Sequence, residues 1–475
     1  MNKVNFFHWN IYIDKYYVLY VQRYKIVMKN ETAYIKIKQS LFLNGTIVVD
    51  GAKNSLLPIM IATMLTRGIS TIHHVPPLLD MYATIKLLQK YNVKILYDEK
   101  EKIITIDTQF MVSTIVNIEF FKALRSSVLF SSVILLNFKE CWLGLPGGDK
   151  IGKRPINIHL DGFKLFGIEV THHSDYIYLK IKNQLVPIDY YLPYPSVGAT
   201  QNFLLLASRI EGKTILRNAA QEPEILDLIE VLEKMGAKIE TYFGGTIVIY
   251  GNSHLSSFDH TIMPDRLEAA TFLLAAAITK GSIHIPNAPA YAMDSIIYHL
   301  KQMGHELEIG KNQYGITFHA AEKSKGINLK TMPYPGLATD YQAPLLALLT
   351  VSEGESVLHE TVFENRMLHA FELNKMGAQI AIESDYAKVK GVPGLYGEIV
   401  SANDVRAAAT LILAGLAAHG ETKVFGLHHL LRGYNGFEKK LQSVGGDVEI
   451  FDYSASVDNH AIEKKIKIEQ LLQTV

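Results

Sequence analysis

A strand–helix–strand pattern recurs along the chain at intervals of about 70 residues, from Thr66 towards the C-terminus. In each copy a glycine precedes a short β-branched or apolar segment, and an amphipathic helix follows. The first strands of these copies are expected after Gly68, Gly212, Gly281, Gly354 and Gly420, with Cys141–Leu143 as a weaker sixth member. The helices are expected to end at Asn92, Gly167, Gly236, Gly304, Gly377 and Gly445, as left-handed C-caps without a chemical role.

Repeated units of strands and helices predict a mixed α/β fold. Six units divide into two sets of three, so we expect two similar domains with a ligand site between them. The Ala-rich segments Ala269–Thr279 and Ala407–Ala418 are expected to be buried helices. The core-like pattern begins near Ile35.

The first 27 residues are rich in aromatic side chains but are interrupted by charges such as Asp14, Lys15 and Arg23. No apolar run approaches the roughly 20 residues of a spanning helix, and no signal-peptide pattern is present. We interpret this segment as an extension, with Met28 as an alternative start. A helix on a membrane surface is the competing interpretation.

The composition of the chain excludes several classes of function and of binding site. The 475 residues predict two or more domains, and the 48% apolar and 20% charged residues are typical of a globular protein. A net charge of zero disfavours general nucleic-acid binding, so an anion site must come from local clustering. The single cysteine, Cys141, excludes an intrachain disulfide and cysteine-rich metal sites. It fits a reducing cytoplasm, and we expect it to be a buried structural residue.

A glycine-rich loop spans residues 143–155. Gly147, Gly148 and Gly152 allow sharp bends, and Lys150, Lys153 and Arg154 lie beside them. Pro155 suits the first position of a helix, whose N-terminus would favour an anion. Asp149 is a poor choice for anion binding alone. The segment 147–153 matches most of a phosphate-binding loop, but Arg154 replaces the Ser or Thr that would bind magnesium. A solvated basic loop is the alternative interpretation.

Other basic residues recur near expected element ends. Lys53 and Asn54 lie at a strand-to-helix turn, and Lys122 and Arg125 are expected on one helix face. Further positions of this kind are Arg366, Arg406 and Arg432. Each alone could be a surface charge, and the segments 196–200 and 339–340 could simply be helix caps. Together they predict a cleft for multiply charged anionic substrates, with Asp149 and Asp340 as acid–base candidates.

These motifs resemble the bacterial enolpyruvyl transferases. The matching segments, in order from about residue 35 to the C-terminus, are GAKN at 51–54, LPGG at 145–148, IGKRP at 151–155, SVGAT at 196–200, EPE at 222–224, PDR at 264–266, TDYQA at 339–343, ETVFENR at 360–366 and LRGY at 431–434. The resemblance implies an inside-out α/β barrel in each of two domains. These would be residues 53–263, and residues 28–52 with 264–475, with the active site between them.

The resemblance also implies a reaction. Its substrates would be phosphoenolpyruvate and UDP-N-acetylglucosamine, whose 3-hydroxyl receives the enolpyruvyl group by addition and elimination as phosphate leaves. This would be the first committed step of peptidoglycan synthesis. No metal or organic cofactor, nucleic acid or membrane span is implied.

Residue roles follow from the motif matches. The catalytic residues would be Lys53, Asp149, Asp340 and Arg432. Phosphate would be held by Lys53, Arg125, Arg154 and Arg432, and the carboxylate by Arg366 and Arg406. Asp340 would be the general base and Asn54 a sugar contact. The nucleotide would be bound by Arg154, Pro155, His159, Ser196, Val197, Gly198 and Val362.

Two positions depart from the resemblance. Asp149 stands where many members have the cysteine that fosfomycin alkylates, so we expect fosfomycin resistance. Tyr194 stands where a lysine often lies near the nucleotide, which puts that contact in doubt. Two other functions stay open. A transferase acting on shikimate phosphate is disfavoured by GAKN and SVGAT, and a non-catalytic UDP-sugar-binding paralogue by the presence of all six cations.

Overall fold

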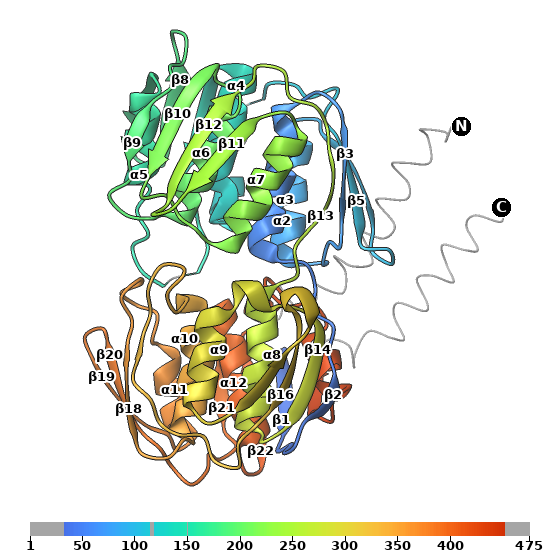
Figure 1. The fold of residues 1–475 in the computed structure, drawn as a ribbon, viewed down its shortest axis with the longest axis vertical. Coiled ribbons are helices and arrows are strands. Elements are labelled where there is room, and N and C mark those ends of the chain that lie inside the picture. The colour runs from blue at the N-terminus through green and yellow to red at the C-terminus, as the bar shows by residue number, and fades with distance from the viewer. Residues whose placement is uncertain (1–32, 115–117, 150, 452–475) are drawn as a thin grey trace, which may run out of the picture.

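The computed structural model describes residues 33–114, 118–149 and 151–451. The predicted extension 1–27, Met28 and Lys150 lie outside this range. The described chain forms two lobes, one above the other in Figure 1. One hydrophobic core is built from residues between Ala52 and Met263 together with Ala292, and the other from residues 33–49 and 267–448. We call them the first and second lobes. The division into domains at the predicted boundaries stays our interpretation.

Three sheets surround the first lobe. In spatial order they are β13 (Asp259–Thr261), β3 (Ile69–His73), β5 (Ile103–Asp107) and β4 (Lys94–Asp98); β6 (Glu140–Gly144), β8 (Tyr176–Ile181) and β7 (Ile168–His172); and β11 (Lys238–Tyr242), β12 (Thr246–Gly251), β10 (Gly212–Arg217) and β9 (Asp189–Tyr191).

The second lobe also carries three sheets. They are β21 (Ile399–Ser401), β22 (Glu421–Phe425), β1 (Tyr34–Lys38) and β23 (Asp447–Phe451); β15 (Glu306–Ile309), β16 (Tyr314–His319), β14 (Ser282–Pro289) and β2 (Asn44–Thr46); and β17 (Leu329–Lys330), β18 (Glu355–His359), β20 (Tyr386–Lys390) and β19 (Gln379–Glu383). The six sheets match the six predicted repeats.

The helices explain why this arrangement is stable. The most apolar ones lie inside the lobes: α2 (Lys53–Ala62), α4 (Phe130–Phe138) and α6 (Val197–Ala207) in the first, and α8 (Arg266–Ile278), α10 (Thr339–Thr350) and α12 (Val405–Ala417) in the second. Every residue of α8 is buried, as predicted for its Ala-rich sequence. α8, α10 and α12 pack against one another. The sheets therefore surround buried helices, which confirms the predicted α/β class.

The remaining helices are shorter or amphipathic. They are α3 (Leu79–Lys90), α5 (Asn157–Leu165), α7 (Pro223–Lys234), α9 (Asp294–Gln302), α11 (His369–Lys375), α13 (Leu427–Leu430) and α14 (Phe437–Gln442), with 3-10 helices η1 (Thr63–Leu65), η2 (Ile118–Ala123), η3 (Ser126–Leu129), η4 (Ala290–Ala292) and η5 (Lys311–Gln313). No helix within the described ranges is both long and apolar enough to cross a membrane.

The second repeat differs from the other five. In each of the other five repeats, the first strand pairs in parallel with a short strand at the edge of its sheet. The first strand of the second repeat, β6, has no such partner among the described residues and itself lies at the edge of a three-stranded sheet. η2 packs against β6 instead. A Cβ at Gly144, the last residue of β6, would lie 2.5 Å from the carbonyl oxygen of Ile118. The missing strand explains why the Cys141–Leu143 pattern is weak. Cys141 itself is buried, as predicted.

Two predicted local features are wrong. Helix α5 begins at Asn157, so Pro155 lies before it rather than at its first position. η2 ends at Ala123 and Arg125 precedes η3, so Lys122 and Arg125 do not share one helix face. Lys122 instead forms an exposed ion pair with Glu119. In both places the intervening backbone is irregular, which helical periodicity cannot reveal.

The lobes are joined where the chain crosses twice. Gly51 forms an antiparallel bridge with Pro264, and the Asp265 N–H donates to the Asp50 carbonyl at 2.7 Å. Lys440 Nζ contacts the carboxylates of Asp50 at 2.8 Å and Glu268 at 2.6 Å. Burial raises the pKa of Asp50, but Lys440 and Lys102 outweigh this and hold the pKa at about 2. The crossing is thus fixed by backbone pairing and by buried charges.

All six predicted C-caps are confirmed as left-handed. Asn92 has a φ of 58°, and the five glycines have φ between 93° and 110°. Asparagine tolerates a φ near 57°, but at larger values a Cβ is strained.

We therefore predict that Gly304→Ala, at a φ of 96°, will lower the free energy of unfolding by about 1–2 kcal/mol. A Cβ there would meet only Ala321 at 3.8 Å, so the cost comes from backbone strain and not from a clash. Asn92→Gly is the matched control and should change the free energy by less than about 1 kcal/mol. Urea unfolding of both variants measures this. If both variants lost the same free energy of unfolding, backbone strain at a large positive φ would not be the cause.

Candidate active site

One chain of ion pairs connects the two lobes. Lys53, the first residue of α2, lies 3.2 Å from the Asp80 carboxylate in the first turn of α3. Arg432, which follows α13 in the second lobe, donates from Nε to Asp80 at 2.8 Å and also pairs with Asp149. The Leu79 N–H donates to the Leu431 carbonyl at 3.1 Å beside them. Asp149 of the glycine loop thus pairs with one predicted phosphate ligand, Arg432, which Asp80 links to a second, Lys53.

A second group of charges surrounds Asp340, in the first turn of α10. Its carboxylate pairs with Arg366, which follows β18, and lies 3.4 Å from Nη2 of Arg406 at the start of α12. Arg406 also donates to the Tyr434 hydroxyl at 2.7 Å. Burial raises the pKa of Asp340, but Arg406 and Arg366 outweigh it and hold the pKa well below its usual range. Asp340 is therefore ionised, and in this pairing it is a weak base.

The competing interpretation of residues 339–340 as a helix cap is not supported. No side chain caps the N-terminus of α10 at Ala338. Thr339 instead donates to Glu360 at 2.8 Å and accepts from Arg366 at 3.0 Å. By contrast, Ser196 does cap α6, accepting from the Ala199 N–H at 3.3 Å.

Arg125 and Arg154 have no carboxylate within 4.0 Å among the described residues. Arg125 donates to the Arg154 carbonyl, and Arg154 lies 3.5 Å from the Asp149 carbonyl. Burial and the charge of Arg154 lower the pKa of Arg125 to about 10. Burial also lowers the pKa of Arg154, and Arg366 and Arg432 add to this while Asp149 opposes it. The basic residues here outnumber the acids, so the site favours an additional anion.

The glycine loop reaches the second lobe. The Asn365 N–H donates to the Ile151 carbonyl at 3.1 Å, and the Arg154 guanidinium lies 5.4 Å from the centre of the Phe363 ring. A Cβ at Gly152 would lie 2.2 Å from the Glu364 carboxylate, and one at Gly147 only 1.7 Å from the Lys122 carbonyl. The glycines thus permit close approach to other parts of this chain, in addition to any ligand.

Of the predicted nucleotide residues, Ser196, Val197 and Gly198 form the N-terminus of α6, and His159 lies beside it. His159 is buried, and a Cβ at Gly198 would lie 3.4 Å from its Nε2. Pro155 and Asn54 are exposed, and Val362 is half-buried. Tyr194 is 41% exposed, and burial followed by the charges of Glu222 and Glu360 raises its pKa. A neutral phenol beside two acids does not replace the positive charge of a lysine.

Comparison with known proteins places this site in a family. The family model described as EPSP synthase (3-phosphoshikimate 1-carboxyvinyltransferase) matches residues 37–441. The chain belongs to this family. The UDP-N-acetylglucosamine 1-carboxyvinyltransferase of Finegoldia magna is 41% identical over 87% of this chain and 98% of its own length. The enzyme of the same name from Elusimicrobium minutum is also 41% identical, over 87% of this chain and 97% of its own.

Solved structures support the fold of this enolpyruvyl transferase. The enolpyruvyl transferase NikO from Streptomyces tendae aligns with a TM-score of 0.80 at 23% identity, covering 88% of this chain and 98% of its own. EPSP synthase from Acinetobacter baumannii aligns with a TM-score of 0.72 at 20% identity, covering 88% of this chain and 100% of its own. At these identities the likeness concerns the fold alone.

Several residues of the site are not indicated by the sequence reasoning. Asp80 links Lys53 to Arg432, Tyr434 supports Arg406, and Glu360 anchors Thr339. An acidic residue in the first turn of a helix is usually explained by its favourable interaction with the helix dipole. The sequence therefore gives no reason to assign Asp80 to the site. Tyr434 was within the LRGY match, but nothing in the pattern assigned it a partner.

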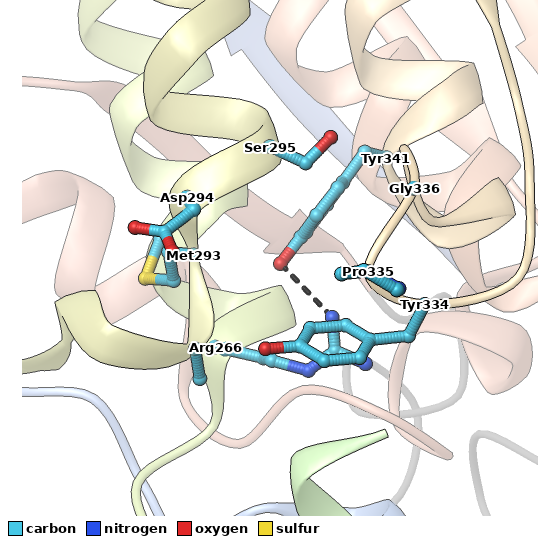
Figure 2. A pocket seen from close by; sticks show the side chains of 9 residues that line it. Arg266, Met293, Asp294, Ser295, Tyr334, Pro335, Gly336 and Tyr341 are labelled. Atoms are coloured by element: carbon cyan, nitrogen blue, oxygen red, sulfur yellow. Dashed lines mark hydrogen bonds between the residues drawn. The ribbon is translucent and has the colours of Figure 1, made fainter. Parts of the chain in front are cut away.

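A small pocket lies where the lobes join (Figure 2). Arg266 forms a buried ion pair with Glu224 at 2.9 Å and donates to the Tyr341 hydroxyl at 3.3 Å, and the Tyr334 ring lies beside it. Nearby, Oε2 of Glu222 is buried without a hydrogen-bond partner in the described residues. Burial raises the pKa of Glu222 to about 7.

This raised pKa predicts a pH-dependent effect on stability. The folded state favours the protonated Glu222, so its contribution is present below about pH 4.5 and is lost as pH rises through about 7. Glu222→Gln mimics the protonated form. It should raise the free energy of unfolding at pH 8 by on the order of 1 kcal/mol and have little effect at pH 4.5. Urea unfolding at both pH values measures this, with Glu233→Gln, at an exposed position of the helix that Glu222 precedes, as control. A gain independent of pH would contradict it.

Proposed function

We propose that this protein transfers the enolpyruvyl group of phosphoenolpyruvate to the 3-hydroxyl of UDP-N-acetylglucosamine and releases phosphate, as a UDP-N-acetylglucosamine 1-carboxyvinyltransferase. This is the first committed step of peptidoglycan synthesis. The observation that carries the proposal is the interlobe cluster of six basic residues around Asp80, Asp149 and Asp340. The names of relatives 39–42% identical to this chain support the choice of substrates.

Phosphoenolpyruvate supplies the anions that the cluster lacks. In our proposal Lys53, Arg125, Arg154 and Arg432 hold its phosphate, and Arg366 and Arg406 hold its carboxylate. Both arginines now bind Asp340. When they turn to the substrate carboxylate, the stabilisation of ionised Asp340 weakens and its basicity rises. Asp340 then accepts the proton of the sugar hydroxyl as the oxygen attacks C2 of phosphoenolpyruvate.

Asp149 has the complementary role. As C2 is attacked, C3 must gain a proton, and in our proposal the Asp149 carboxyl gives it. Asp149 now accepts a hydrogen bond from Arg432. Movement of Arg432 onto the substrate phosphate would leave Asp149 free to take up the proton that it later donates. Loss of phosphate from the tetrahedral adduct, with return of one C3 proton to the Asp149 carboxylate, then completes the transfer.

The sugar nucleotide is proposed to bind along the first lobe. Asn54 contacts the sugar, and the nucleotide lies against Arg154, Pro155, His159, Val362 and the segment 196–198. A cytoplasmic location is part of the proposal, supported by Cys141, the only cysteine in the sequence, which cannot form an intrachain disulfide. That the reaction needs no cofactor, and that nucleic acid is not a partner, stay predictions.

Shikimate 3-phosphate is the second candidate acceptor, because the matching family model carries the name of the shikimate enzyme. A non-catalytic protein that binds UDP-sugars is the third candidate. The acceptor that supports phosphate release distinguishes the three.

We predict that purified protein will release phosphate from phosphoenolpyruvate only when UDP-N-acetylglucosamine is present. Asp340→Asn should lower kcat by roughly 10²–10⁴-fold, because it removes the base but preserves the shape of the side chain. Asp385→Asn is the matched control, since this partly exposed acid of the second lobe forms an ion pair with His359 at 2.8 Å and does not pair with Arg366 or Arg406. Release with shikimate 3-phosphate, or undiminished release by Asp340→Asn, would overturn the assignment.

Fosfomycin tests the role of position 149. The resemblance implies that the drug alkylates a thiol, and Asp149 offers none, so activity should persist after incubation with it. Asp149→Cys should lose activity progressively under the same conditions, and the natural protein, which has no thiol at this position, is its matched control. Residual activity is followed against time of preincubation. Rapid inactivation of the natural protein would refute the prediction.

A further inference from the structure

His159 has a defined hydrogen-bond partner behind it. Asn202 of α6 is fully buried, and its Nδ2 lies 3.0 Å from Nδ1 of His159. The mechanism proposed above gives Asn202 no task. An asparagine amide can present either a donor or an acceptor, so its orientation decides which nitrogen of the imidazole carries the proton.

The surroundings of Asn202 fix that orientation. Its Nδ2 also lies 3.2 Å from the Val128 carbonyl, which can only accept. Ser132 of α4 donates to its Oδ1 from the other side. Turning the amide over would place Oδ1 against the Val128 carbonyl, two acceptors with no proton between them. The amide nitrogen therefore faces His159, and Nδ1 of the imidazole accepts.

We infer that Asn202 is a positioning residue that holds His159 as a neutral imidazole with its proton on Nε2, aimed at an acidic oxygen bound at the first turn of α6. The Nε2 edge faces this turn, since a Cβ at Gly198 would lie 3.4 Å away. The first N–H groups of a helix have no intrahelical acceptor, and although Ser196 accepts from the Ala199 N–H, those of Val197 and Gly198 stay free of other acceptors among the described residues, beside Nε2–H. The identity of the oxygen, as part of a sugar-nucleotide diphosphate, rests on the proposed function.

A neutral donor suits this location. Arg125 is the charged residue whose field acts on His159 among the described residues, and α6 faces the ring with the Asn202 amide and the Phe203 ring. Burial first, and then Arg125, lower the pKa of His159 to about 3. The ring therefore donates a hydrogen bond at neutral pH without adding a positive charge beside Arg125.

The first test requires no substrate, and a variant only to assign the peaks. Long-range ¹H–¹⁵N spectra of the labelled full-length protein distinguish protonated from bare ring nitrogens, and the peaks lost in His159→Gln identify His159. We expect a proton on Nε2 alone from pH 6 to 9. A proton on Nδ1, or a doubly protonated ring in this range, would overturn the inference whether or not the protein is a transferase.

The second test uses the isosteric change Asn202→Asp. A carboxylate opposite Nδ1 draws the proton there and raises the pKa of the imidazole. At pH 6 the charged ring still donates from Nε2, but at pH 9 the neutral ring presents a bare Nε2 to the anion. The KM for UDP-N-acetylglucosamine should therefore rise about 10-fold or more between pH 6 and 9, and the KM for phosphoenolpyruvate should not.

Asn137→Asp in α4 is the matched control. It makes the same chemical change at a part-buried amide of the same lobe, which donates to the Met64 and Val133 carbonyls. A merely structural effect would change stability in both variants without this pH profile. A flat profile in folded Asn202→Asp would contradict the inference, and if that variant does not fold, the spectra of the natural protein decide. The two proposals can fail separately. If the spectra show the proton on Nε2 but the transferase assay detects no activity, the proposed substrates are wrong and the inference about Asn202 stands.

Discussion

The excess of positive charge between the lobes is the constraint on which the rest of the site depends. Cations removed from water are costly unless they are paired. Here Asp80, Asp149 and Asp340 pair with Lys53, Arg366, Arg406 and Arg432, while Arg125 and Arg154 lack carboxylate partners among the described residues. An arriving phosphate and carboxylate would relieve this repulsion. In our proposal, substrate binding and the release of Asp149 and Asp340 from their arginine partners are therefore two results of one redistribution of charge.

The repeated architecture explains how so many charges reach one place. α2, α10 and α12 bring functional residues in their first turns, where backbone N–H groups already favour anions. Their apolar remainders are fixed in the two cores. Since the acids and bases come from both lobes, the site is complete only when the lobes are held together. The paired crossing at Gly51 and Pro264 limits how they can move apart.

The sequence predicted the repeat and its caps well because these depend on local properties. Left-handed φ values require glycine or asparagine, and buried helices require small apolar residues. The start of α5 and the relation of Lys122 to Arg125 were wrong because the segments between them are irregular. The roles of Asp80 and Asn202 were not predicted, for another reason. Their roles are defined by partners distant in sequence, Arg432 and His159, and no spacing rule reveals such pairs.

Asp149 shows how one substitution can alter the coupling within such a site. A neutral thiol at this position would be a weak partner for a guanidinium, whereas the carboxylate forms an ion pair with Arg432. Because Arg432 belongs to the second lobe, this pair adds to the Ile151–Asn365 contact in holding the loop across the interface. In our proposal this pair breaks before Asp149 takes up the proton that it donates to C3. Under the same proposal the position of the loop is coupled to the protonation of Asp149, because substrate phosphate competes with Asp149 for Arg432 and so affects both.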